Sequence, residues 1–306
     1  MARSARASGG GTLSSLLVIL LTGALVAAAC ALLGSFLLLR KMAMMVDAIS
    51  HAILPGIVAA YFLAQGPNLL AGFVGAAAAG LLTVTLVEAV QRGRTVTHDA
   101  AMGIVFSGLF ALGVFVTSRF FAEVHLDADA VLYGTLEFAA QDLLIIGDRS
   151  FGPQALWVMG GLLGINLLVV TLLYKELKLA TFDPLLAASL GFSPGWLQYA
   201  LMTMVSVTAV GGFTAVGAVL VVALFIVPPA TAFLLTERLA RMIALAVALG
   251  MSAALVGTLL AFITDTSIAG AIASVAGLQF GLALLAATLR NALRRLREAR
   301  RLSRAA

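Results

Sequence analysis

Long runs of apolar residues constrain this chain more than any other feature of its sequence. They lie near residues 14–39, 45–63, 69–90, 100–121, 153–174, 197–212, 215–235, 243–262 and 268–289. A helix needs about 20 apolar residues to cross the hydrocarbon core of a bilayer. The sequence therefore predicts an all-α, polytopic transmembrane helical bundle with eight or nine spans. The ambiguity lies at Gly211-Gly212, where two runs form either separate spans or one helix broken inside the membrane.

The composition leaves no room for a large soluble domain. The chain has 306 residues, of which 62% are hydrophobic and 11% charged, and its mean hydropathy is +1.09. We expect an N-terminal tail over 1–12, a transmembrane domain over 13–290 and a basic tail over 291–306.

The net charge of +5 does not indicate nucleic-acid binding, because arginines gather at chain ends and short loops. The single cysteine, Cys30, excludes an internal disulfide and a cysteine pair as metal ligands.

Positive residues predict the orientation of the bundle, since cytoplasmic loops are rich in lysine and arginine. These residues occupy alternate loops and the C-terminal tail, and the loop residues are Arg40, Lys41, Arg92, Arg94, Lys175, Lys178, Arg238 and Arg241. Nine full spans would place Arg3 and Arg6 outside, against this trend.

The acidic loop over 119–152 is predicted to lie on the outer side of the membrane. There His125, Asp127 and Asp129 are candidate external cation contacts, with capping of a following helix as the alternative.

Small residues recur every four positions on several runs, which places them on one helix face and predicts close packing between helices. The sets are Gly72/Ala76/Gly80, Gly103/Ser107/Ala111, Gly160/Gly164 and Gly277/Gly281.

Prolines inside two of the predicted spans are expected to bend the helices. Pro55 removes the hydrogen bond to the carbonyl of His51, and Pro228 and Pro229 release the carbonyls four residues before them. We expect a kink at each place, which serves either gating or packing.

Asp47 and His51 are the residues most indicative of chemistry. They lie one turn apart, so both side chains share a helix face. Ionisable residues inside a span cost about 2.5–3.5 kcal/mol each on insertion scales and are functional candidates by default. A carboxylate and an imidazole suit manganese, iron(II) or zinc. The alternative is an Asp–His ion pair in which Asp47 complements the helix dipole.

The predicted cytoplasmic stretch over 174–191 should contain a short exposed helix. Asp183 is a good N-cap, Pro184 a good first residue and Gly191 a good terminator. The apolar surface of this helix indicates a contact with another protein, or folding back onto the bundle. Its candidate contact residues for an ATPase are Phe182, Asp183, Pro184, Leu185, Leu186 and Ser189. The sequence has no Walker A loop, Gly-x-Ser-x-Gly or His-Glu-x-x-His motif, so we expect no enzyme activity and a separate source of energy.

From about Leu33 to Leu285, the chain resembles the membrane permeases of the zinc/manganese/iron ABC importer family, of ABC-3 type. Segment 46–56 is similar to the family's Gly-Asp-Ala-x-Ser-His-Ala-x-Leu-Pro-Gly, with Val46 in place of the first glycine. Segments 99–107, 174–191 and 219–232 match a helix start, the Tyr-Lys-Glu-Leu…Phe-Asp-Pro coupling region and a proline-containing helix of the same family.

This resemblance implies the fold of an ABC importer permease of the metal/vitamin-B12 type in a bacterial inner membrane. It implies a homo- or heterodimer with a second permease protomer, a cytoplasmic ABC ATPase dimer and an extracytoplasmic metal-binding protein. It places Asp47 and His51 on the metal path and the helix after Asp183 at the ATPase. No cofactor is expected to be bound permanently, and the transported ion would be Mn²⁺, Fe²⁺ or Zn²⁺. Segment 125–134 looks like the manganese/iron branch.

Four alternatives remain open. A zinc-specific ABC permease differs only in its metal. A secondary transporter driven by an ion gradient should have buried acidic residues in several spans, whereas only Asp47 stands out. A membrane scaffold would not need an Asp/His pair beside a proline. A vitamin or siderophore permease fits the architecture, but segment 46–56 favours a bare metal ion.

Overall fold

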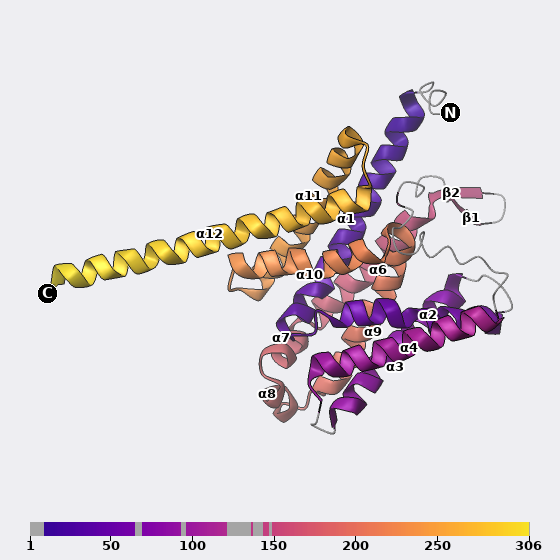
Figure 1. Ribbon diagram of the computed structural model, residues 1–306, viewed down its shortest axis with the longest axis horizontal. Coiled ribbons are helices and arrows are strands. Elements are labelled where there is room, and N and C mark those ends of the chain that lie inside the picture. Colours follow the sequence, from indigo (N-terminus) through magenta and orange to yellow (C-terminus); the bar gives the residue numbers. More distant parts are fainter. Residues whose placement is uncertain are drawn as a thin grey trace.

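The fold is a bundle of long helices, seen here in a computed structural model (Figure 1). The structure describes residues 9–64, 69–92, 96–120, 136, 143–146 and 149–305, so His125, Asp127 and Asp129 lie outside the described residues. The helices of the first half are α1 (Gly9–Leu39), α2 (Met45–Ala64), α3 (Leu69–Arg92) and α4 (His98–Phe120). Those of the second half are α6 (Gln154–Leu172), α7 (Tyr174–Phe182), α8 (Pro184–Ser189), α9 (Pro194–Val216), α10 (Ala218–Leu235), α11 (Leu239–Thr264) and α12 (Ile268–Ala305).

Nine helices in the described part of the chain are long and apolar enough to cross a membrane, and only α7 and α8 are not. This confirms the predicted all-α bundle and selects nine spans over eight. A two-stranded antiparallel ribbon, β1 (Leu143–Ile146) and β2 (Arg149–Pro153), lies before α6 and was not predicted. Helix α12 continues to Ala305 and extends away from the bundle (Figure 1).

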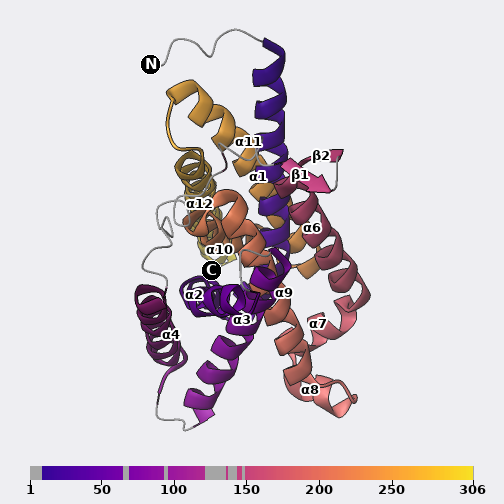
Figure 2. The same cartoon turned by 90° about the vertical axis from the view of Figure 1, so that its right-hand side faces the viewer.

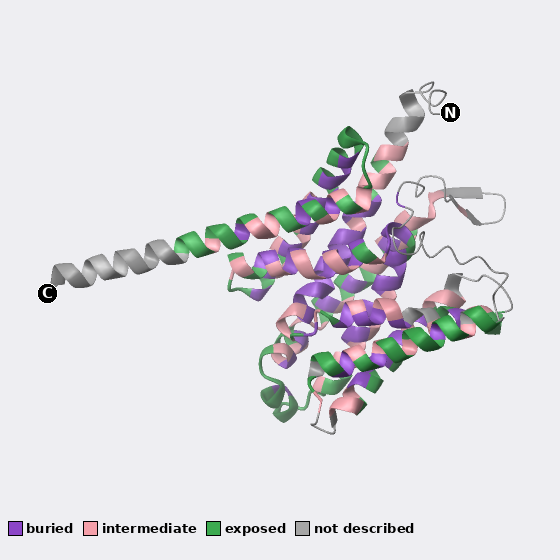
Figure 3. Ribbon diagram, viewed as in Figure 1, coloured by how far each residue is buried: buried purple, intermediate pink, exposed green. Residues whose placement is uncertain are grey.

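Helix α1 lies at the centre of the bundle and is apolar on all sides. Its side chains from Ala24 to Leu37 are buried almost without exception, with Cys30, Leu33 and Phe36 at 0% exposure. Figure 3 shows this buried centre and the exposed outer faces of the surrounding helices. A helix that is apolar on all sides is buried either in a protein core or in a membrane. The exposed leucines on the outer helices are therefore expected to contact lipid.

The break in the second half of the bundle lies at Gly217 and not at Gly211-Gly212. Both of the earlier glycines lie inside α9, where a Cβ at Gly211 would meet Leu162 and one at Gly212 would meet Val221. Gly217 has φ +87°, a left-handed conformation that only glycine adopts easily, and it separates α9 from α10. The glycine pair therefore provides space for neighbouring side chains, while the next glycine breaks the helix.

Close packing through small residues occurs at fewer positions than the spacing predicts. A Cβ on Gly80 of α3 would collide with Ser206 of α9, so those two backbones do approach. For the other predicted glycines the expectation is wrong within this chain, because nothing lies within 4 Å of a Cβ at Gly72, Gly103, Gly160, Gly164, Gly277 or Gly281. Four-residue spacing indicates a smooth face, but it does not tell which faces meet.

Arg40 and Lys41, at the end of α1, lie beside α7, the helix that carries Lys175 and Lys178. Figures 1 and 2 both show the start of α1 at the opposite end from α7 and α8. At the end of α1, Lys41 has φ 58°, and the hydrogen bonds from Met42 N to Leu37 O and from Lys41 N to Leu38 O form a Schellman turn. This turn, the start of α4 and the start of α9 surround one polar pocket. Which side of the membrane this end faces stays a prediction.

Candidate metal path and coupling surface

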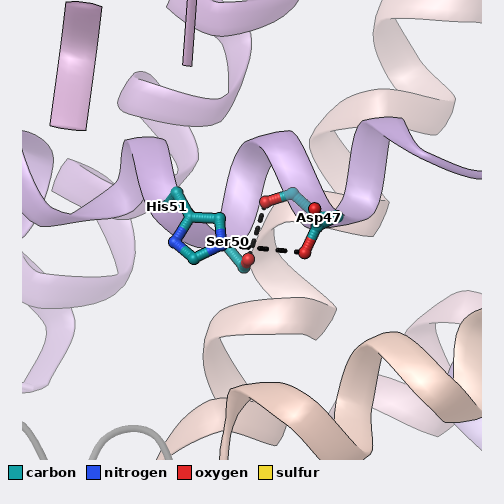
Figure 4. Close-up of polar contacts among 3 residues, drawn as sticks. All are labelled: Asp47, Ser50 and His51. Carbon is teal, nitrogen blue, oxygen red and sulfur yellow. Dashed lines mark hydrogen bonds and ion pairs between the residues drawn. The ribbon is translucent and has the colours of Figure 1, made fainter. Parts of the chain in front are cut away.

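Asp47 and His51 lie on one face of α2, as their spacing predicts. Asp47 is in the first turn of the helix, and its Oδ1 is 3.7 Å from Nε2 of His51. Figure 4 shows the two side chains directed to the same side. The hydroxyl of Ser50 donates to the backbone oxygen of Asp47 at 2.6 Å, so it leaves the carboxylate free for other contacts. The pair is therefore aligned by the helix itself.

Two phenylalanines of α4 hold the His51 ring. The ring centroid lies 5.6 Å from that of Phe106 and 5.8 Å from that of Phe110, the latter in an edge-on arrangement. These aromatic contacts restrict the imidazole while one side stays open, since the side chains of His51 and Asp47 are 42% and 40% exposed. No sequence pattern indicates these neighbours, because Phe106 and Phe110 are ordinary apolar residues of another span.

The distance between the two side chains suits a shared divalent ion. Two ligand atoms about 2.1 Å from one ion at a tetrahedral angle lie about 3.4 Å apart, close to the observed 3.7 Å. No group of three or more His, Cys, Asp or Glu side chains that could hold a metal exists among the residues that the structure describes. The pair could offer one oxygen and one nitrogen to an ion, and its role as a metal site stays a prediction.

Pro55 and Pro228-Pro229 are placed differently. Pro55 lies inside α2, where it lines an apolar cavity of about 650 Å³ between α2, α3 and α4. Pro228 and Pro229 are buried inside α10. The Phe225 carbonyl that Pro229 leaves without its helical partner lies against Gly34 of α1, where any Cβ would collide with it. This contact supports a packing role for the second proline. The gating role of Pro55 stays a prediction.

The short helix after Asp183 forms as predicted. Asp183 Oδ1 accepts a hydrogen bond from Leu186 N at 2.9 Å, Pro184 is the first residue of α8, and Gly191 has φ +87° after its end. Folding back onto the bundle is limited to Ala187, which is fully buried. The large side chains are exposed, with Phe182 at 60%, Leu185 at 84% and Leu186 at 46%. A cluster of exposed large apolar side chains such as this one is typical of a protein contact.

A polar group at the end of α3 was not predicted from the sequence. Glu88 of α3 accepts hydrogen bonds from Gln198 Nε2 at 2.7 Å and from the Tyr199 hydroxyl at 2.6 Å, both on α9. Glu88 and Gln198 line a pocket of about 450 Å³ whose other charged or amide residues are Arg40, Lys41, Gln91 and Asp99. The only signal in the sequence was an acidic residue inside a predicted span.

Arg40 connects this pocket to α7. Its Nε donates to Thr181 Oγ1 at 3.1 Å, and that hydroxyl donates to the carbonyl of Leu177. Burial lowers the pKa of the Arg40 guanidinium. The contact joins the end of α1 to the helix that precedes the exposed apolar surface of α8.

Comparison with known proteins identifies the family of this chain. Residues 13–287 match the ABC 3 transport family. The chain is 43% identical over 256 residues to the manganese transport system membrane protein MntD of Bacillus subtilis, covering 84% of this chain and 86% of the relative. It is 46% identical over 266 residues to the zinc transport system membrane protein TroD of Treponema pallidum, covering 87% and 72%.

A solved structure has the same fold. The structure of PsaBC from Streptococcus pneumoniae in complex with Fab superposes with a TM-score of 0.73 at 28% identity, covering 88% of this chain and 90% of that chain. The resemblance drawn from segments 46–56 and 174–191 is thereby confirmed. The chain belongs to the ABC 3 transport family and is an integral protein of the bacterial cell membrane.

Proposed function

We propose that this chain is the permease subunit of an ATP-driven importer of divalent transition-metal ions, with manganese as its substrate. The Asp47/His51 pair carries the proposal, because it presents one carboxylate and one imidazole on the open face of a helix in a chain of the ABC 3 family. Oxygen and nitrogen ligands without thiolate suit Mn²⁺, Fe²⁺ or Zn²⁺. A 43% identical relative named for manganese transport favours manganese, and a relative named for zinc keeps zinc as the alternative.

A second permease protomer would complete the path. The open sides of Asp47 and His51 are too polar to face lipid, where an ionisable side chain is expensive. A second protomer placed against this face would cover both side chains and bring a second carboxylate and imidazole to the path. Water would supply any remaining ligand. An extracytoplasmic metal-binding protein would deliver the ion, and alternating access would move it inward.

ATP hydrolysis would take place on separate cytoplasmic subunits that bind α8. The exposed Phe182, Leu185 and Leu186 form an apolar surface that matches such a contact. A secondary transporter is the competing function, and Glu88 is one observation in its favour, being a further acidic residue in a span. Both oxygens of Glu88 accept hydrogen bonds, however, which suits a fixed carboxylate better than one that cycles protons.

Reconstitution separates these functions. The permease and its ATPase are placed in proteoliposomes, and entry of manganese, zinc and iron is measured by element with ATP or with an imposed proton gradient. We expect manganese uptake that requires ATP and continues when a protonophore collapses the gradient. Uptake that follows the proton gradient without ATP would overturn the proposal in favour of a secondary transporter.

A further inference from the structure

Glu88 is an acidic residue within a membrane span, near the end of α3, and the metal path described above does not use it. Ionisable residues at such positions are functional candidates by default. Its two carboxylate oxygens are each engaged by a different residue of α9, at 2.7 Å from Gln198 and 2.6 Å from Tyr199. Hydrogen bonds to a charged acceptor are shorter and stronger than those between neutral groups. The contact therefore fixes the end of α3 to the first turns of α9.

The position of α9 gives this contact its significance. Helix α9 begins at Pro194, and only residues 190–193 separate it from α8. Gly191 turns the chain at φ +87°, and Ser193 caps α9 through a hydrogen bond from Trp196 N. A connection this short transfers a displacement of α8 to the start of α9, where Gln198 and Tyr199 lie.

Helix α3 also contacts the helix that carries Asp47 and His51. Gly75 of α3 and Gly56 of α2 touch so closely that a Cβ on either would collide with the carbonyl oxygen of the other. Further along α3, Gly80 packs directly against Ser206 of α9. Helix α3 is thus held on one side by α9 and on the other by α2. Packed helices move as units, because close-packed interiors transmit strain.

We propose that Glu88 is a positioning residue that couples the ATPase-binding helix α8 to the metal-binding helix α2, through α9 and α3. The inference rests on the proposed function as an ATP-driven importer. Glu88 does not bind the metal in this mechanism, and its two carboxylate oxygens instead hold Gln198 and Tyr199 of α9. Its loss would leave metal binding at Asp47 and His51 intact and would separate ATP hydrolysis from transport.

The test uses the whole permease–ATPase complex in proteoliposomes and measures three quantities. These are manganese ions transported per ATP hydrolysed, the affinity for Mn²⁺ at equilibrium and the thermal midpoint. Glu88→Ala removes the carboxylate, and Tyr199→Phe removes a single oxygen atom with little effect on packing. Gln279→Leu is the matched control, because it removes a hydrogen bond to Ser252 between α12 and α11, away from α8, α9, α3 and α2.

We expect Glu88→Ala and Tyr199→Phe to lower the transport ratio at least fivefold, with Mn²⁺ affinity within twofold of the wild type. The double variant should be no worse than Glu88→Ala, because both changes break one contact. Glu88→Gln should restore part of the ratio, because its amide oxygen still accepts from Tyr199.

Two results would overturn the inference. One is a transport ratio in Tyr199→Phe that equals that of the wild type or is matched by Gln279→Leu. The other is a loss of Mn²⁺ affinity in Glu88→Ala, which would make Glu88 a ligand. Failure of the proposed function is distinguishable, because then the wild-type complex itself would show no ATP-driven uptake.

Discussion

Gly56 of α2 and Gly75 of α3 lie back to back, and each leaves no room for a Cβ because the carbonyl oxygen of the other occupies that space. The contact fixes how far the helix with Asp47 and His51 lies from α3. Because the atoms that would collide belong to two backbones, no change of side-chain rotamer can relieve an added methyl group.

Gly75→Ala should therefore destabilise the protein by about 1–3 kcal/mol, the usual range for overpacking in a tight core. Gly72→Ala is the control on the same helix, since nothing lies within 4 Å of a Cβ there. Thermal unfolding of the purified protein in detergent checks both. Equal thermal midpoints for the two variants would contradict the observed approach of α2 and α3.

Gly34 makes a comparable prediction for the centre of the bundle. The Phe225 carbonyl, which Pro229 leaves without a helical partner, lies against Gly34, so Gly34→Ala should destabilise the protein by about 1–3 kcal/mol. Gly23→Ala on the same helix should have little effect, because its nearest neighbours would be at 3.6 and 3.9 Å. Unfolding curves for the pair decide whether this carbonyl packs against α1.

The N-cap of α8 predicts how the coupling surface responds to mutation. Asp183→Ala removes the acceptor for Leu186 N and should cost α8 about 1 kcal/mol, whereas Asp183→Asn caps nearly as well. We expect weaker co-purification of the ATPase and lower metal-stimulated ATP hydrolysis with Asp183→Ala only. An unchanged response in both variants would count against a role for α8 in ATPase binding.

The exposed leucine of α8 tests the same surface in a different way. Leu185 is 84% exposed, so Leu185→Glu should change the free energy of unfolding of the isolated permease by no more than about 0.5 kcal/mol. A charge in an apolar protein contact is costly, so the affinity for the ATPase should fall at least tenfold. Binding of the ATPase to permease in nanodiscs measures this, and an unchanged affinity would place the contact elsewhere.

Local spacing predicted much of the site, while contacts between distant segments could not be predicted. Asp47 and His51 meet because a helix brings positions four apart together, and Asp183 caps α8 because its side chain reaches a nearby amide. The contact between Glu88 and Tyr199 joins residues 111 positions apart, and no local rule indicates it.

Glycine showed the same limit. The sequence pointed to Gly211-Gly212 as the possible break, whereas the chain turns at Gly217, which has φ +87°. Gly211 and Gly212 lie inside α9, which continues to Val216, and Leu162 and Val221 fill the space beside them.

The most direct test of the account is metal uptake by Asp47→Asn. This variant keeps the shape of the side chain but removes the charge that would bind the ion. Asp265→Asn is the matched control, because Asp265 is an exposed residue in a left-handed turn after α11, a conformation that asparagine also adopts. In proteoliposomes with the ATPase, we predict that Asp47→Asn lowers ATP-driven manganese uptake at least tenfold while Asp265→Asn matches the wild type. Undiminished uptake of manganese, zinc and iron by Asp47→Asn would contradict the assignment of Asp47 and His51 to the metal path.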